Sequence, residues 1–142
     1  MPGFFERLLD LWETPVDGRD DPEAAFRELY ADPLLLNGSP VPVSSLVDRA
    51  RAMQRALANR TTEIVEQVET PGRLAVAFYV RGEHLGPLET PLGTVNSTGR
   101  RVEIRTIDVL TIVDGVVTEI WVVSDELGML GQLEAVRLVS AG

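Results

Sequence analysis

Apolar positions follow a helical period in the first part of the chain and predict three helices there. The first helix covers residues 4–12, where six apolar side chains fall on one side of a helical wheel: Phe4, Phe5, Leu8, Leu9, Leu11 and Trp12. A second, short helix is expected over residues 24–30, and a short buried strand over residues 34–36 follows it. The third helix opens with the capping-box pattern Ser45-x-x-Asp48 and runs to about Ala58.

From residue 61 the period changes to two, which predicts strands over residues 62–69, 74–80, 101–113 and 116–123. Pro71-Gly72 turns the chain between the first two strands, and Asp114-Gly115 is typical of a hairpin between the last two. The last two strands carry apolar side chains on both faces. Such a sheet is either covered by helices on both sides or curved around a pocket and packed against a partner. Helices followed by an antiparallel meander indicate one α+β domain over residues 1–142.

The connection over residues 82–99 is much longer than two antiparallel strands need. It contains four glycines, two prolines and three leucines, namely Leu85, Leu88 and Leu92. Long loops inside compact domains are often lids or binding loops, although a tolerated insertion is the simpler alternative. We expect this segment to act as a lid whose leucines pack over a ligand.

Charge and composition exclude several functions. The chain has 22 acidic against 13 basic residues, a net charge of −9, which repels nucleic acid and anionic membrane surfaces. It contains neither lysine nor cysteine, so a Schiff-base lysine, a thiolate nucleophile and a sulfur-ligated metal are excluded. His84 is the only histidine, and we expect neither a metal nor a cofactor. No apolar stretch approaches the roughly 20 residues of a membrane span and the first residues do not resemble a signal peptide, so we expect a soluble, cytoplasmic protein.

Asp125 is the first candidate for acid–base chemistry. It follows an apolar strand, and a carboxyl group among apolar neighbours has its pKa raised towards neutrality, where it can accept and donate a proton. Trp121 lies four residues earlier, on the same face of an extended strand, and suits a planar aromatic ligand. Alternatively, Ser124 or Asp125 simply caps a C-terminal helical turn.

His84 and Asp108 are the other candidates. His84 stands between Gly82 and Gly86, so it is either a structural loop residue or a proton shuttle that reaches the pocket when the loop closes. Asp108 is a carboxylate within an apolar strand, and burying it is costly unless it is hydrogen-bonded or faces a polar cavity. The interpretation we favour for Asp108 is that it faces solvent on the outer side of the sheet.

The stretch from Thr98-Gly99-Arg100 through Asp114-Gly115 to Trp121-x-x-x-Asp125-x-Leu127-Gly128-x-Leu130-x-Gln132-Leu133 resembles the C-terminal half of the SnoaL-like polyketide cyclases. The resemblance implies an NTF2-like cone, in which N-terminal helices pack on a curved antiparallel sheet and enclose a pocket. It also implies a homodimer formed through the sheet and a cofactor-independent cyclase acting on a hydrophobic, carbonyl-rich, polyketide-like molecule. Asp125 falls on the family's acid–base residue, and His84 is its candidate partner. The candidate substrate contacts are Trp121, Phe78, Tyr30, Asp108, Leu85 and Met129.

Aldol cyclases of that family pair the aspartate with a histidine on the preceding strand, where this chain offers Thr111. Two other functions therefore stay open. One is a small-molecule-binding protein of the same fold without turnover. The other is epoxide hydrolysis of the limonene type, which needs Arg and Asp two residues apart on one strand. Arg105 and Asp108 are three apart and so fall on opposite faces, which disfavours this function.

Overall fold

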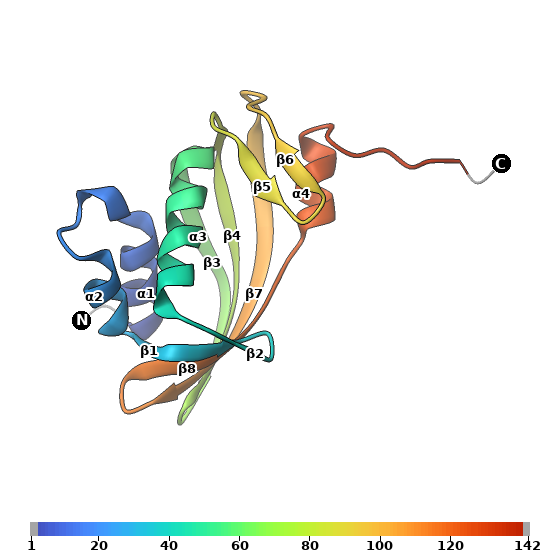
Figure 1. The fold of residues 1–142 in the computed structure, drawn as a ribbon. Helices are drawn as coiled ribbons and strands as arrows, with labels where there is room; N and C mark the ends of the chain where they lie inside the picture. The colour runs from blue at the N-terminus through green and yellow to red at the C-terminus, as the bar shows by residue number, and fades with distance from the viewer. Residues whose placement is uncertain (1–2, 141–142) are drawn as a thin grey trace.

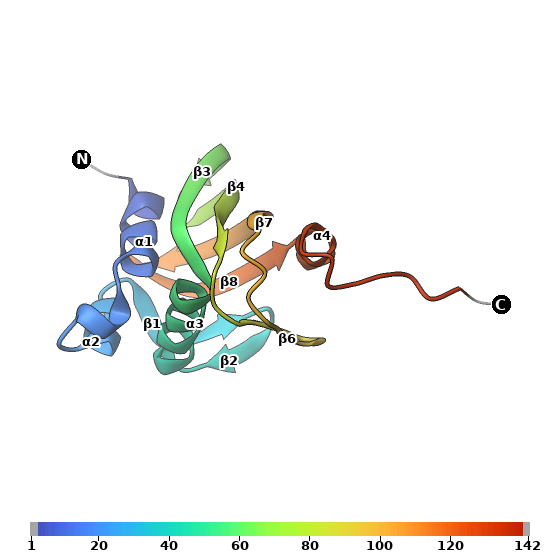
Figure 2. The ribbon, with the colours of Figure 1, turned by 90° about the horizontal axis from the view of Figure 1, so that it is seen from above.

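A computed structural model describes residues 3–140 and shows a curved sheet with three helices on one side (Figure 1). The helices are α1 (Phe4–Glu13), α2 (Pro22–Arg27) and α3 (Val43–Ala56), with the short 3-10 turn η1 (Val16–Gly18) between the first two. A fourth helix, α4 (Glu126–Gln132), follows the last strand and lies on the far side of β7 from α1 (Figure 2). None of the helices within residues 3–140 is long and apolar enough to cross a membrane.

The main sheet has six strands in the order β2-β1-β8-β7-β4-β3. These strands are β1 (Tyr30–Leu36), β2 (Ser39–Val41), β3 (Leu57–Thr70), β4 (Arg73–His84), β7 (Arg101–Val113) and β8 (Val116–Ser124). All neighbours pair antiparallel except β1 and β8, which run parallel. The remaining strands, β5 (Leu88–Thr90) and β6 (Gly93–Val95), form a separate hairpin beside α3.

Alternation along β7 decides which side chains face the helices. Val102, Ile104, Thr106 and Leu110 are buried on the inner face, whereas Glu103, Arg105 and Ile107 between them are exposed on the outer face. A larger core forms between α1, α2, α3 and the inner face of the sheet, and a smaller one forms where α4 and β5 cover its end. The inner face of the sheet therefore carries the core, and the outer face of β7 and β8 stays uncovered.

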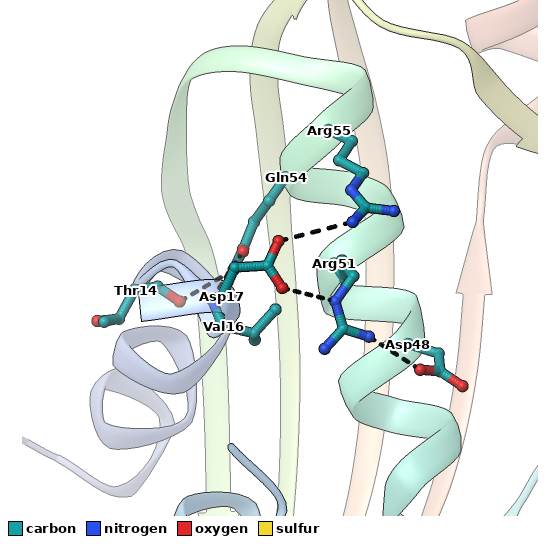
Figure 3. Close-up of polar contacts among 7 residues, drawn as sticks. All are labelled: Thr14, Val16, Asp17, Asp48, Arg51, Gln54 and Arg55. Carbon is teal, nitrogen blue, oxygen red and sulfur yellow. Dashed lines mark hydrogen bonds and ion pairs between the residues drawn. The ribbon is translucent and has the colours of Figure 1, made fainter. Parts of the chain in front are cut away.

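Polar contacts fasten η1 and the end of α1 to α3 (Figure 3). Asp17 pairs with Arg51 at 2.8 Å and with Arg55 at 3.7 Å. The Gln54 side chain accepts from the backbone N–H of Val16 and donates to the carbonyl oxygens of Trp12 and Thr14. These contacts hold α1, η1 and α3 in one arrangement, and they fix Trp12 where α1 meets the sheet.

The structure confirms the predicted α+β class, the first helix, the long strands and the hairpin at Asp114-Gly115, where both residues have positive φ. Two predictions are wrong. The helix expected at Ser45 begins at Val43, with Pro42 at its N-cap position, so Ser45-x-x-Asp48 lies inside the helix and caps nothing. Residues 28–30 are not helical, because the chain enters β1 at Tyr30 and pairs with β8.

Candidate functional site

The inner face of the sheet and helix α1 enclose a largely apolar cavity of about 220 Å³. Its apolar lining includes Phe5, Leu8, Leu9, Trp12, Phe78, Val80 and Val122. A wider space of about 500 Å³ adjoins it between α3, β5 and the ends of β1 and β8, and the two share Trp12, Met53, Val122 and Ser124. This arrangement suits a hydrophobic small molecule that enters beside α3 and reaches the inner face of the sheet.

Asp108 supplies a carboxyl group on the sheet side of this cavity. It occupies an inward position of β7, between Val76 of β4 and Val122 of β8. Its Oδ1 atom is buried and has no hydrogen-bond partner, and burial raises the pKa of the carboxyl group to about 7. The interpretation that Asp108 faces solvent on the outer side of the sheet is therefore wrong. At neutral pH the group is present in both protonation states, as a general base and general acid must be.

Tyr30 lies in the same lining and is buried at the start of β1. Its hydroxyl oxygen accepts a hydrogen bond from the indole N–H of Trp12 at 2.8 Å. Burial raises the pKa of Tyr30 far above its usual value; the Trp12 bond opposes this shift and the negative charge of Asp108 adds to it. Tyr30 therefore stays protonated and keeps a hydroxyl hydrogen to donate inside the cavity. Thr106 and Ser124, whose hydroxyls are 3.0 Å apart, complete the polar groups around Asp108.

A second polar group lies at the beginning of β3. Arg60 lines the same cavity, and its Nη2 atom donates to the Trp12 carbonyl oxygen. Its Nη1 atom is buried without a hydrogen-bond partner. Glu13 also lines the cavity and accepts a hydrogen bond from Thr62 at 3.0 Å. No sequence pattern points to a site role for Arg60 or Trp12, because an arginine in an alternating strand and a tryptophan in an amphipathic helix give no distinct signal.

Asp125 lies outside this lining, at the N-cap of α4, where it accepts from the backbone N–H of Gly128 at 2.9 Å. The side chain of Arg105, on the outer side of β7, donates to it at 2.7 Å. The Arg105 hydrogen bond and then the Gly128 N–H lower the pKa of Asp125, so the expected upward shift is wrong. Asp125 therefore caps the C-terminal helix, which is the alternative to an acid–base role that its sequence position allowed. Trp121 is 52% exposed on the outer face, bonded to Glu119, and does not contact the cavity.

His84 is fully buried at the end of β4 and does not line the cavity. Its Nδ1 atom lies 2.9 Å from the Thr98 hydroxyl, and its backbone pairs with Arg100 and Gly99. These contacts tie the two ends of the 82–99 segment together, as expected if His84 is a structural loop residue and not a proton shuttle. Leu85 is exposed and Met129 is buried in the smaller core under α4, so neither lies where a ligand in the cavity would touch it.

Of the six predicted substrate contacts, the cavity brings together Phe78, Tyr30 and Asp108. Thr111, at the position expected to hold a histidine, faces away from the cavity and bonds Arg73 on the sheet surface. Asp108, three positions before Thr111 on β7, is the nearest residue of that strand that both points into the cavity and can transfer a proton. Arg105 and Asp108 do lie on opposite faces, as their spacing predicts. Among residues 3–140, no group of three or more histidine or carboxylate side chains is placed to hold a metal ion.

Comparison with known proteins agrees with this architecture. A family model described as SnoaL-like polyketide cyclase matches residues 6–133. TsrD from Streptomyces laurentii superposes with a TM-score of 0.76 at 19% identity, over 94% of this chain and 93% of that one. IdmH from Streptomyces antibioticus gives 0.69 at 23% identity, over 94% and 99%. A SnoaL-like polyketide cyclase from Agrobacterium tumefaciens gives 0.70 at 16% identity, over 94% and 99%. No curated protein sequence matches significantly. At these identities the solved structures establish the fold, and the cavity residues carry any argument about chemistry.

Proposed function

Because the chain belongs to the SnoaL-like polyketide cyclase family, we propose that it is an acid–base enzyme acting on a hydrophobic, carbonyl-rich molecule, with Asp108 moving the proton. One observation supports this assignment above the others. Asp108 is a largely buried carboxyl group with an unpartnered oxygen, in a cavity whose other walls are mostly apolar. Its pKa of about 7 matches the requirement that a general base and its conjugate acid coexist near neutral pH.

The proposed reaction is an intramolecular aldol closure that needs no cofactor. The Asp108 carboxylate takes a proton from the carbon next to a substrate carbonyl, which leaves an enolate. The enolate carbon attacks a second carbonyl of the same molecule, one carbon–carbon bond forms, and the resulting alkoxide takes the proton back from Asp108. The hydroxyl of Tyr30, which stays protonated, can hydrogen-bond the developing oxyanion in the same lining.

The test is hydrogen–deuterium exchange at the acidic carbon of 2-tetralone, a bicyclic ketone, followed by NMR in D₂O. We expect the protein to accelerate exchange, with a rate that rises with pH and levels off above an apparent pKa of about 7. Asp108→Asn should lower the rate by at least about 100-fold, as expected for loss of a general base. Asp125→Asn is the matched control and should keep the wild-type rate, because asparagine still caps α4 and Asp125 lies outside the cavity.

Two results would contradict the proposal. If Asp125→Asn abolishes exchange and Asp108→Asn does not, the acid–base residue is the one that the family resemblance implies. If the wild-type protein binds 2-tetralone without accelerating exchange, the cavity belongs to a small-molecule-binding protein without turnover.

A further inference from the structure

The inner cavity has a second polar end, at Arg60. Arg60 lines the cavity, and its Nη2 atom donates to the Trp12 carbonyl oxygen, while its Nη1 atom is buried and has no acceptor. Burial lowers the pKa of Arg60, and nearby Glu13 opposes that shift. A buried guanidinium nitrogen with no partner is unfavourable by itself, so an acceptor oxygen on a ligand would complete it.

The two polar ends are well separated along the sheet. Asp108 pairs with Val76 of β4, whereas Thr62 pairs with Val80, four residues further along that strand. Four residues of strand correspond to about 13 Å, and Arg60 precedes Thr62 by two positions. The side chains of Phe5 and Phe78, with ring centroids 5.2 Å apart, lie in the same lining and keep it apolar. One small carbonyl group cannot contact both Asp108 and Arg60, but an elongated molecule can.

Charge favours a neutral ligand oxygen at this end. Glu13 already lies close enough to affect Arg60, and Asp108 adds a second carboxyl group to the lining. The chain as a whole carries a net charge of −9. A carboxylate ligand would meet this negative surface, whereas a ketone or ester oxygen accepts a hydrogen bond without adding charge.

We infer that Arg60 is a substrate-binding residue whose free Nη1 donates to a ketone or ester carbonyl, at the opposite end of an elongated apolar substrate from Asp108. The inference takes the substrate pocket of the proposed function as its premise, but it is tested by binding and not by turnover. It specifies a substrate with two separated oxygen functions joined by an apolar section.

The experiment compares 2-acetylnaphthalene with 2-isopropenylnaphthalene, a hydrocarbon of nearly the same shape, by isothermal titration calorimetry at pH 8.5. At this pH Asp108 is mostly ionised and cannot donate to a ketone, so a ketone preference there reports on another donor. We expect the wild-type protein to bind the ketone about tenfold more tightly than the hydrocarbon, as one hydrogen bond from a charged donor allows. Arg60→Met should bring this ratio close to one while hydrocarbon binding is retained.

Arg73→Met is the matched control and should keep the ketone preference, because Arg73 bonds Thr111 on the sheet surface and does not line the cavity. If Arg60→Met does not bind the hydrocarbon, Arg60→Gln replaces it, because the glutamine amide can still donate to the Trp12 carbonyl without a charge. The ratio of ketone to hydrocarbon affinity is then measured for this variant.

A wild-type protein without ketone preference, or an Arg60 variant that retains it, overturns the inference and leaves the proposed function standing. Tighter binding of 2-naphthoate than of the ketone overturns the assignment of a neutral oxygen. If the wild-type protein binds none of these probes, the pocket and the proposed function fail together.

Discussion

At the scale of single residues, Asp108 combines an inward strand position with a lack of hydrogen-bonding partners. In the folded protein its pKa is about 7, whereas an unfolded chain ionises aspartate near pH 3.8. Between these values the folded state holds the proton more tightly, so folding stability decreases as the pH rises from about 4 to about 7 and stays reduced above that. The group suited to proton transfer is therefore one that weakens the fold at neutral pH.

Asp108→Asn should consequently raise the free energy of unfolding by roughly 2–4 kcal/mol at pH 8 and by much less at pH 4. Denaturant unfolding at both pH values measures the difference. Asp125→Asn is the comparison, because the Arg105 contact lowers the pKa of Asp125 and its loss should not stabilise the protein at either pH. Equal effects of Asp108→Asn at the two pH values would show that Asp108 is not buried as an acid.

His84 is expected to act on stability and not on catalysis. The side chain is fully buried and bonded to Thr98, so His84→Ala should lower the free energy of unfolding by roughly 2–4 kcal/mol. The folded variant should retain the wild-type rate of 2-tetralone exchange, measured at a temperature where it stays folded. Leu85→Ala, at the exposed neighbouring position, should change stability by less than about 0.5 kcal/mol. A large loss of exchange in folded His84→Ala would restore the proton-shuttle hypothesis.

At the scale of elements, the 82–99 segment is a hairpin on a fixed base. The backbone N–H groups of Leu85 and Gly86 both donate to the Ala56 carbonyl, and Leu88 is buried against the smaller core. Leu88 and Glu89 line the wider space of about 500 Å³ that adjoins the cavity, whereas Leu92 at the tip is 80% exposed. Only one of the three leucines is buried, so any lid motion belongs to the tip.

Hydrogen exchange measured by mass spectrometry tests this lid hypothesis. Peptides covering residues 89–94 should exchange rapidly in the free protein and become protected when 2-acetylnaphthalene binds, because the tip gains contacts only with a ligand in place. Peptides covering the base, residues 84–86, should be protected in both states. Protection of the tip without ligand would rule out the lid.

Gly86 fixes the position of the hairpin, since a Cβ atom there would lie 2.0 Å from the Arg55 carbonyl oxygen. Gly86→Ala should therefore move the hairpin off α3 and lower the midpoint of thermal unfolding by several degrees, in the range that about 1–2 kcal/mol produces. Gly18→Ala is the matched control, because nothing lies within 4 Å of its Cβ position, and its unfolding midpoint should stay near that of the wild type. Similar midpoints for both variants would contradict a tight contact at Gly86.

At the scale of the whole molecule, we propose that the outer face of β7 and β8 joins two copies in a homodimer. Ile107, Trp121 and Val123 are more than half exposed there, and large uncovered apolar patches usually mark interfaces. Val117 of β8 is fully buried in the core and does not contribute to this patch.

Light scattering at micromolar concentration should report twice the chain mass of 15.6 kDa. Val123→Asp should convert this particle to one chain, whereas Val68→Asp, at an exposed position of edge strand β3, should leave it unchanged. A wild-type particle of a single chain would refute the proposed homodimer.

The sequence by itself determined the α+β class, the long strands and the Asp114-Gly115 hairpin, because periodicity and turn preference are local properties of the chain. The motif around Trp121 and Asp125 likewise indicated the family. Only the tertiary structure decided which carboxyl group is buried. Asp108 and Asp125 both neighbour apolar residues in the sequence, but strand alternation turns Asp108 into the cavity, while the start of α4 gives Asp125 a backbone partner and Arg105. Arg60 and Trp12 meet because α1 packs on β3. These residues are 48 positions apart in the chain, so no local sequence pattern can predict their contact.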